Sequence, residues 1–347
     1  MTMKRNTILI ITGLLIMAAS CEKSEYLSEG DFFHLSHKGA KMPVWVMGNF
    51  NSDVILITVH GGPGDAGMGF HLAPGFQKLE QDYMIAYWDQ RFSGMTQGHY
   101  DRSTMQPEQF IEDTDRIVKL IQDRYPGKKL FMLGHSWGGA LSAGYLGRNN
   151  HADDFRGWID LNGGIYAELE AQLMREWILP RIPEKLAEPD ADTEFWQYIL
   201  DWYEANPNPT GYSDYEPYWY TSALGGDVYD LDAYFENNPI PYGELILRSM
   251  FSFSYYINSF AAQKGIKAWD EVDYTEELHN ISIPSLMLWG ANDAIVPVQV
   301  ADYVYDHLGT EASMKRVVLI EQCGHGPQSE KPEEFYAEIS SFIETYK

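Results

Sequence analysis

The chain has 347 residues, of which 25 are Lys or Arg and 50 are Asp or Glu, so its formal net charge is −25. Such a charge repels nucleic-acid phosphates, and we therefore expect no nucleic-acid partner. Hydrophobic residues make up 45% of the chain, which excludes a disordered protein, and two cysteines are too few for a disulfide scaffold or a Cys-rich zinc site.

The first 21 residues carry the features of an export signal. Two basic residues precede an apolar run over 8–19. A helix of that length spans only about 18 Å, less than a bilayer core of about 30 Å, so we interpret residues 1–21 as a signal peptide. The end of this segment, Ala-Ala-Ser-Cys21, resembles the lipobox of bacterial lipoproteins. The resemblance implies lipidation of Cys21, a membrane anchor at the cell envelope and a tether over 22–30; an ordinary cleaved signal is the alternative.

The rest of the chain alternates strand-like and helix-like segments. Segments 32–37 and 44–48 are predicted to form an antiparallel edge. Apolar runs typical of strands buried on both faces follow at 54–59, 84–88, 129–133, 158–161, 285–289 and 317–320. Helical patterns lie at 107–125, 138–148, 298–308 and 332–346. This alternation predicts an α/β fold with a doubly wound, mostly parallel sheet.

One segment, 165–277, interrupts the alternation. It holds 23 aromatic residues, and its 22 acidic residues outnumber its 6 basic ones. We interpret it as an inserted, mostly helical cap over the carboxyl edge of the sheet, where ligands bind in such folds. The core then comprises 31–164 and 278–347.

The motif G-x-S-x-G occurs at 134–138, between an apolar strand-like segment and a helix start. A sharp strand-to-helix turn strains its central residue and requires small residues on both sides. The central Ser136 would lie at a helix N-terminus, where free N–H groups favour developing negative charge. We therefore predict that Ser136 is a nucleophile.

A serine nucleophile needs a base, and the base needs an orienting carboxylate. In doubly wound hydrolases the order is Ser, then Asp or Glu, then His after the last strand. His325 has that place, and Asp293 follows the strand-like segment 285–289. Asp160, at the end of an earlier strand, is the alternative acid, whereas His60 is expected to be structural.

Oxyanion stabilisation requires backbone donors near the nucleophile. One is the N–H of Trp137, directly after Ser136. The second should come from the loop after 54–59, which reads His-Gly-Gly-Pro-Gly at 60–64. Glycines there let the backbone approach a substrate carbonyl.

Three motifs together, H-G-G-P-G at 60–64, D-Q-R-F-S-G at 89–94 and G-H-S-W-G-G at 134–139, resemble the proline iminopeptidase family of α/β-hydrolases. With G-A-N-D at 290–293 and G-H at 324–325, the resemblance spans about 40–345. It implies an α/β-hydrolase core with a helical cap, and release of N-terminal Pro or other small or apolar residues from short peptides without a metal or other cofactor. It also implies a triad of Ser136, Asp293 and His325, with oxyanion donors from Gly62 and Trp137.

The chain departs from the family pattern at Phe92, where the family has glycine, and at His135, where Gly or Ser is frequent. Family members hold the substrate ammonium with acidic residues from the cap or beside the triad acid, where Ala294 stands here. The candidate carboxylates in this chain are Glu168, Glu170, Glu204 and Glu244. Two alternatives remain: an esterase or lactonase acting on a small apolar ester, and a lipoprotein that binds a ligand without turnover.

Overall fold

The computed structural model describes residues 30–99, 101–209, 214, 216–237 and 269–347. The predicted signal peptide, Cys21 and Glu244 lie outside these residues. Within them, no helix combines the length and the apolar character needed to cross a membrane.

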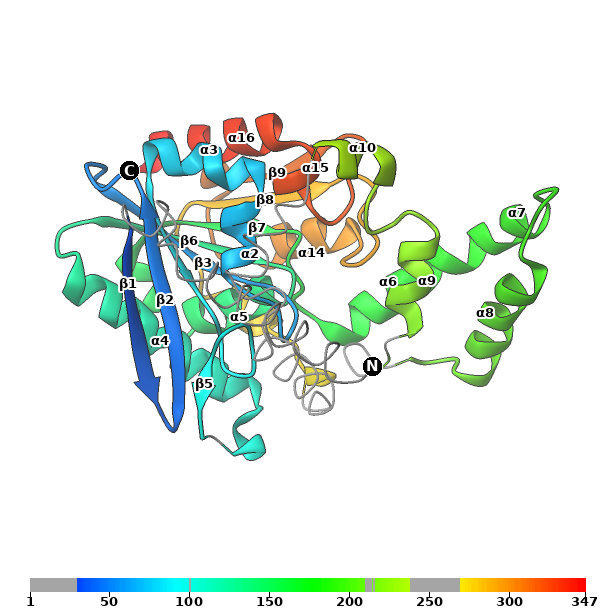
Figure 1. Ribbon diagram of the computed structural model, residues 1–347, viewed down its shortest axis with the longest axis horizontal. Coiled ribbons are helices and arrows are strands. Elements are labelled where there is room, and N and C mark those ends of the chain that lie inside the picture. Colours follow the sequence, from blue (N-terminus) through cyan, green and yellow to red (C-terminus); the bar gives the residue numbers. More distant parts are fainter. Residues whose placement is uncertain (1–29, 100, 210–213, 215, 238–268) are drawn as a thin grey trace, which may run out of the picture.

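A mixed sheet forms the centre of the molecule (Figure 1), with its main strands in the order β1-β2-β4-β3-β6-β7-β8-β9. The strands are β1 (Asp31–His37), β2 (Ala40–Gly48), β3 (Val54–Val59), β4 (Met84–Trp88), β5 (Gln97–Gly98), β6 (Lys129–His135), β7 (Phe155–Leu161), β8 (Ser285–Gly290) and β9 (Lys315–Ile320). β1 and β4 both pair antiparallel with β2, and β3 onward run parallel. The carboxyl ends of six strands therefore meet at one edge.

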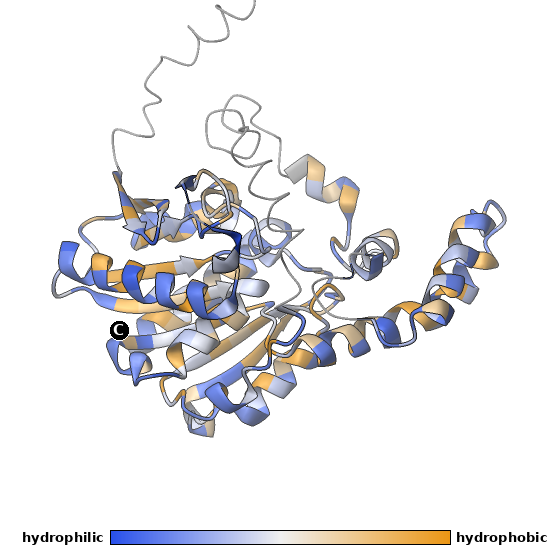
Figure 2. Cartoon of the chain, turned by 90° about the horizontal axis from the view of Figure 1, so that it is seen from below, coloured by the Kyte–Doolittle hydropathy of each residue, from blue (hydrophilic) through white to orange (hydrophobic). Residues whose placement is uncertain are grey.

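Helices cover both faces of this sheet. The core helices are α2 (Met68–Leu72), α3 (Pro74–Asp82), α4 (Pro107–Arg124), α5 (Trp137–Leu146), α13 (Thr275–Leu278), α14 (Gln299–His307), α15 (Pro327–Glu330) and α16 (Pro332–Tyr346). In β3, Ile55 and Ile57 belong to the hydrophobic cluster with α4 and α5, whereas Val54 and Leu56 belong to the one with α3 and α16. This two-sided burial explains why the strand reads as a continuous apolar run. Figure 2 shows the hydrophobic strands enclosed by helices with hydrophilic outer surfaces.

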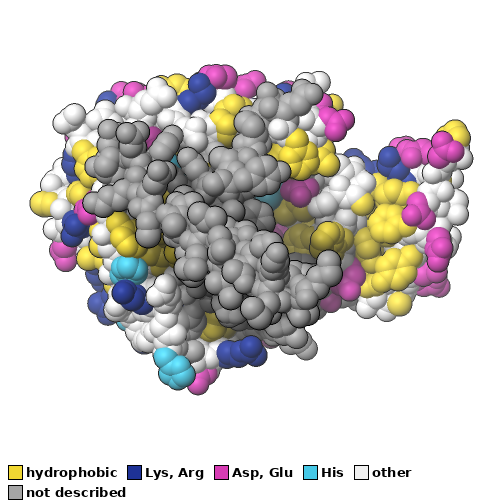
Figure 3. Space-filling view, in the orientation of Figure 1, with side chains coloured by type: hydrophobic (Ala, Val, Ile, Leu, Met, Phe, Trp, Pro, Cys, Tyr) yellow, Lys and Arg dark blue, Asp and Glu magenta, His cyan; other side chains and the backbone are white. Residues whose placement is uncertain are grey.

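The described part of the insertion after β7 folds largely as helices, of which α6 to α9 form an arm that extends from the core, while α10 lies beside α15 (Figure 1). Its helices are α6 (Ala167–Ile178), α7 (Ile182–Leu186), α8 (Thr193–Ala205), α9 (Glu216–Ala223) and α10 (Leu231–Asn237). The arm has its own hydrophobic cluster, which includes Ile178, Trp196 and Tyr203. Figure 3 shows hydrophobic and acidic side chains interspersed on its surface. Several of the described aromatic residues of this segment therefore hold its helices together.

The predicted strands and long helices are observed with small shifts at their ends, and 54–59, 84–88 and 332–346 coincide with β3, β4 and α16. The sequence reading missed α2 and α3, which connect β3 to β4. Pro74 is the first residue of α3, a position that favours proline. The five-residue helix α2 ends just before it, and this break interrupts the helical spacing of apolar residues in the sequence.

Candidate active site

Ser136 lies in a sharp turn between β6 and α5, with φ 56° and ψ −128°. A Cβ atom at Gly134 would lie 2.3 Å from the Gly138 carbonyl oxygen, and one at Gly138 would lie 2.0 Å from that of Val59. Neither position can accept a side chain without moving backbone. The two glycines of the motif are thus a steric requirement of a turn that lifts Ser136 out of the sheet edge.

The Ser136 backbone is held firmly, while its side chain is half-buried. Its carbonyl oxygen accepts hydrogen bonds from Gly139 N (2.8 Å) and Gly164 N (3.0 Å), and its N–H donates to the Leu161 carbonyl (3.2 Å). The hydroxyl makes no hydrogen bond to any described residue. It is therefore available to other partners.

His325 and Asp293 form a pair at the same sheet edge, in the loops that follow β9 and β8. His325 Nδ1 lies 2.8 Å from Asp293 Oδ2. The other oxygen of Asp293 accepts backbone N–H groups of Ile295 (2.9 Å) and Val296 (3.2 Å), and Asn162 Nδ2 donates to Oδ2 at 2.6 Å. A carboxylate that accepts all these bonds leaves Nδ1 of His325 as the donor and Nε2 as the acceptor.

Neighbouring carboxylates act on the His325 imidazole. Burial disfavours its charged form, but the charge and hydrogen bond of Asp293, and then the charges of Asp227 and Asp65, outweigh burial and raise the pKa of His325. Asp65 is exposed to solvent, yet protein surrounds it closely enough that desolvation raises the pKa of its carboxyl. Several carboxylates therefore stabilise the protonated form of the His325 imidazole.

His135 connects the serine turn to the His325 loop. Its Nε2 lies 2.9 Å from the His325 carbonyl oxygen, and the two rings are 4.7 Å apart between centroids. Burial, followed by the charge of His325, lowers the pKa of His135 to about 3, so this ring is neutral and donates through Nε2. The residue before the serine thus places the turn and the imidazole side by side. No hydrogen bond joins the Ser136 hydroxyl to the His325 ring in this structure; free hydrolases are often looser here than their complexes.

The family described as alpha/beta hydrolase fold matches residues 54–332. The chain belongs to that family. The probable aminopeptidase YbaC of Bacillus subtilis is 25% identical over 325 residues, which cover 88% of this chain and 94% of that protein. The proline iminopeptidase of Saccharolobus solfataricus is 24% identical over 298 residues, with 83% of this chain and 84% of that protein covered.

A similar solved structure is that of the proline iminopeptidase-related protein TTHA1809 from Thermus thermophilus. It has a TM-score of 0.62 at 19% identity, covering 92% of this chain and 98% of that one. The matches confirm the resemblance drawn from the motifs and the α/β-hydrolase fold with its cap.

In this α/β-hydrolase the loop after β3 lies against the serine turn. A Cβ atom at Gly61 would lie 2.9 Å from the Ser136 Cβ atom. Gly62 has φ +113°, and its N–H makes no hydrogen bond to a described residue. His60 supports the loop, because its Nε2 accepts the Gln90 N–H (3.1 Å) and burial lowers its pKa to about 4.

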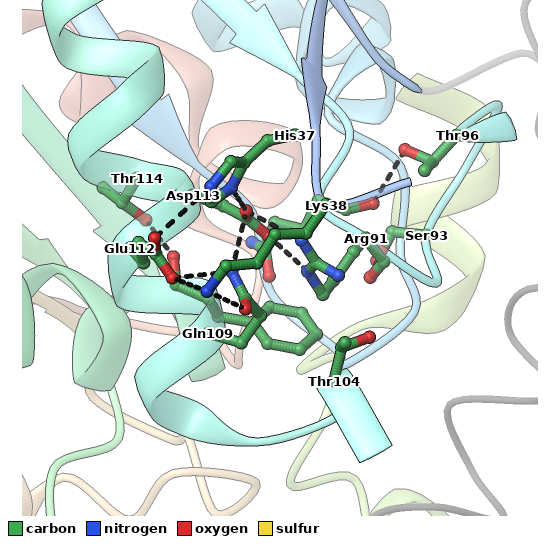
Figure 4. Close-up of polar contacts among 12 residues, drawn as sticks. His37, Lys38, Arg91, Ser93, Thr96, Thr104, Gln109, Glu112, Asp113 and Thr114 are labelled. Atoms are coloured by element: carbon green, nitrogen blue, oxygen red, sulfur yellow. Dashed lines mark hydrogen bonds and ion pairs between the residues drawn. The ribbon is translucent and has the colours of Figure 1, made fainter. Parts of the chain in front are cut away.

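The loop over 89–94 reinforces the same region. Gln90 Nε2 donates to the His60 carbonyl (2.8 Å), while its Oε1 accepts from Trp137 Nε1 (3.2 Å). The next residue, Arg91, is fully buried and bonds Asp113 through two nitrogens, one at 2.8 Å, in the network of Figure 4. The D-Q-R motif therefore holds Trp137, the residue after Ser136, through Gln90.

Phe92, which departs from the family motif, adopts a backbone conformation that favours glycine. Phe92 has φ 58°, in the left-handed region where the family has glycine. A side chain costs about 1–2 kcal/mol in this region, but the Phe92 ring is buried in the main core, which offsets that cost.

Asp160, the alternative acid, does not hydrogen-bond the His325 imidazole. It is buried against Gly139 and Gly163, and neither carboxyl oxygen has a hydrogen-bond partner within the described residues. Burial, with a smaller effect of the Glu170 charge, raises its pKa well above the usual value. The carboxylate that contacts His325 is that of Asp293.

The predicted substrate-binding carboxylates have different positions. Glu170 is buried, accepts the N–H groups of Ile165 (2.6 Å) and Tyr166 (3.0 Å), and has a pKa raised by burial to about 6. Glu168 is exposed and accepts a bond from Tyr166 Oη (3.1 Å), and Glu204 is exposed on α8. Glu170 interacts electrostatically with both Asp293 and His325.

Sequence reasoning missed three site residues: Asn162, His135 and Asp65. Asn162 follows β7 directly and could have been found as a polar residue at the carboxyl end of a strand. Asp65 follows the H-G-G-P-G loop. Within the described residues, no group of three His, Cys, Asp or Glu side chains could hold a metal ion.

Proposed function

We propose that this chain is a serine aminopeptidase of the proline iminopeptidase type, with Ser136, Asp293 and His325 as its triad. The observation that carries the proposal is the Asp293–His325 hydrogen bond in loops beside the strained turn of Ser136, with the H-G-G-P-G loop packed against the same turn through Gly61. The names of the relatives with near full-length coverage support the same activity.

In the proposed reaction Ser136 Oγ attacks the scissile carbonyl carbon while His325 Nε2 takes the hydroxyl proton. The N–H groups of Gly62 and Trp137 stabilise the oxyanion, and Asp293 stabilises the imidazolium. His325 then gives its proton to the leaving amine. A water molecule, deprotonated by the same imidazole, hydrolyses the acyl-enzyme. Formation of the substrate complex brings the hydroxyl into hydrogen-bond distance of the ring.

Specificity for a free amino terminus is supported by the carboxylates around the base. Asp65 is exposed and makes no hydrogen bond to a described residue, and its charge acts on His325. We assign it as the first contact of the substrate ammonium, with Asp227 as a second negative charge nearby. Glu168, Glu204 and Glu244 remain candidates for contacts farther along the substrate.

A substrate panel tests this function. Proline and alanine p-nitroanilides should be cleaved, their N-acetylated forms should not, and Ser136→Ala should abolish turnover. If cleavage is indifferent to N-acetylation, the exopeptidase assignment is wrong. If p-nitrophenyl esters are the only substrates, the chain is an esterase instead. If Ser136 also resists fluorophosphonates, a binding protein without turnover remains.

We also propose that residues 1–21 direct export and that Cys21 is lipidated, which would anchor the enzyme to the cell-envelope membrane. The supporting observation is the sequence pattern alone. Growth with radiolabelled palmitate should label the wild-type chain and leave Cys21→Ser unlabelled. A wild-type chain without label would leave the ordinary cleaved signal as the explanation.

A further inference from the structure

Three consecutive backbone N–H groups fix the loop that carries His325, which we call the base loop (323–326). Gly324 N and Gly326 N both donate to one oxygen of Glu330, at 3.0 and 3.3 Å. Between them, His325 N donates to the Asp227 carbonyl at 2.6 Å. A loop without regular secondary structure is therefore held by one carboxylate from α15 and one carbonyl from the cap.

The second oxygen of Glu330 reaches the cap itself. Glu330 Oε2 accepts the Tyr229 N–H at 2.8 Å. Tyr229 belongs to the segment between α9 and α10, residues 226–229, which we call the cap strap. One side chain thus bonds the base loop on both sides of His325 with one oxygen, and the cap with the other.

The cap strap also contacts the loop of the acid. The Gly226 carbonyl accepts the Ala294 N–H at 2.9 Å, next to Asp293. The packing leaves little space, because a Cβ atom at Gly226 would lie 2.8 Å from Ala294 Cβ, and one at Gly324 would lie 2.2 Å from the Asp227 carbonyl oxygen. The cap strap can pack this closely because residue 294 is a small alanine. In the family an acidic residue sometimes stands at this position beside the triad acid.

We infer that Glu330 is a positioning residue: its carboxylate ties the cap strap to the base loop, so that the docked cap holds the backbone of His325 where the imidazole can serve Ser136. This inference rests on the proposed function. Glu330 does not reach the reacting atoms, and it acts through the backbone on either side of His325.

The first test compares Glu330→Gln with Glu334→Gln in the full chain. A glutamine offers one acceptor oxygen and one amide donor, so it can satisfy the base loop or the strap but not both. We expect kcat and the rate of fluorophosphonate labelling of Ser136 to fall about tenfold or more, with KM changed less than twofold. The acid limb of kcat/KM should move to lower pH, because a loosened contact with Asp293 lowers the pKa of His325. Glu334 is exposed on α16 without a described partner, so its variant should match the wild type.

A second pair of variants tests whether the hydrogen bond from the cap strap to Glu330 affects the reactivity of Ser136. Tyr229→Pro removes the N–H that donates to Glu330, while Tyr229→Ala keeps it and removes the exposed side chain. We expect the proline variant alone to lose about tenfold in labelling rate. Equal labelling of Glu330→Gln and wild type, or equal rates for the two Tyr229 variants, would overturn the inference. A wild-type chain that is not labelled at all would instead reject the proposed function.

Discussion

Substitution of Asp293 by Asn is the most direct test of the proposed triad. Asp293 Oδ1 accepts two backbone N–H groups, so the oxygen of an asparagine should keep that place. The new amide group would then face Asn162 Nδ2 and His325 Nδ1, and two hydrogen bonds to a carboxylate would become donor–donor contacts. His325 must respond by moving its proton to Nε2, which removes the acceptor that Ser136 needs.

The size of the effect follows from the lost charge and the changed tautomer. A hydrogen bond to a charged group contributes about 1.5–3 kcal/mol, and restoring the productive His325 tautomer against the amide costs a similar amount, so the total is about 3–6 kcal/mol. At about 1.4 kcal/mol per decade this corresponds to a decrease of about 10²–10⁴ in kcat/KM. The assay is p-nitroanilide hydrolysis alongside fluorophosphonate labelling. Asp302→Asn, exposed on α14, is the control. A decrease of less than tenfold in a folded Asp293→Asn variant would refute the assignment of the acid.

Three further substitutions test the supporting structure. Arg91→Leu removes the guanidinium partner of the buried Asp113 carboxylate and should lower the free energy of unfolding by about 3–5 kcal/mol in urea titrations; a loss below about 1 kcal/mol would contradict the described ion pair. Gly138→Ala places a methyl group 2.0 Å from the Val59 carbonyl and should cost about 1–3 kcal/mol and abolish labelling of Ser136, whereas normal labelling would show that the turn can widen. Burial raises the pKa of Asp89 to about 6, so the folded wild type takes up this proton before the unfolded chain does and gains stability as pH falls from 6 toward 4. The free energy of unfolding of Asp89→Asn should therefore drop more steeply over this range, by about 1.4 kcal/mol per pH unit, and parallel curves would show an ordinary carboxyl.

The parts of the fold that the sequence predicted are those that local pattern controls. β3 and β4 are buried on both faces, so almost every residue is apolar, and the hydroxyl of Thr58 is satisfied by the Ala86 carbonyl; the run could therefore be read directly. The glycines at 134 and 138 are required within one turn, and His325 and Asp293 follow strands whose carboxyl ends meet at one edge. Local signals and a topological rule were sufficient to select these residues.

The contacts that hold the site together could not be read from the sequence, because they join residues that are far apart in the chain. Glu330 bonds Tyr229 across 101 positions, and Asn162 bonds Asp293 across 131. Nothing in the composition of the cap distinguishes the strap carbonyls from those of its other loops. Glu170 is a residue for which the sequence suggested the wrong kind of contact. It was predicted to bind substrate, but its carboxylate accepts backbone N–H groups at the start of α6.

The carboxylates around His325 also connect substrate binding to the base. Asp65 and Asp227 help to raise the pKa of the imidazole in the free enzyme, and a general base works only when it is neutral. An ammonium group bound to Asp65 would neutralise part of that charge, so the pKa of His325 should be lower in the complex than in the free enzyme. The acid limb of kcat, which reports the complex, should therefore lie at lower pH than that of kcat/KM for a free-amino substrate. An ester without an amino group should leave both limbs at the same pH. If the ester shows the same displacement as the peptide substrate, the ammonium does not bind beside the base, and Asp65 has another role.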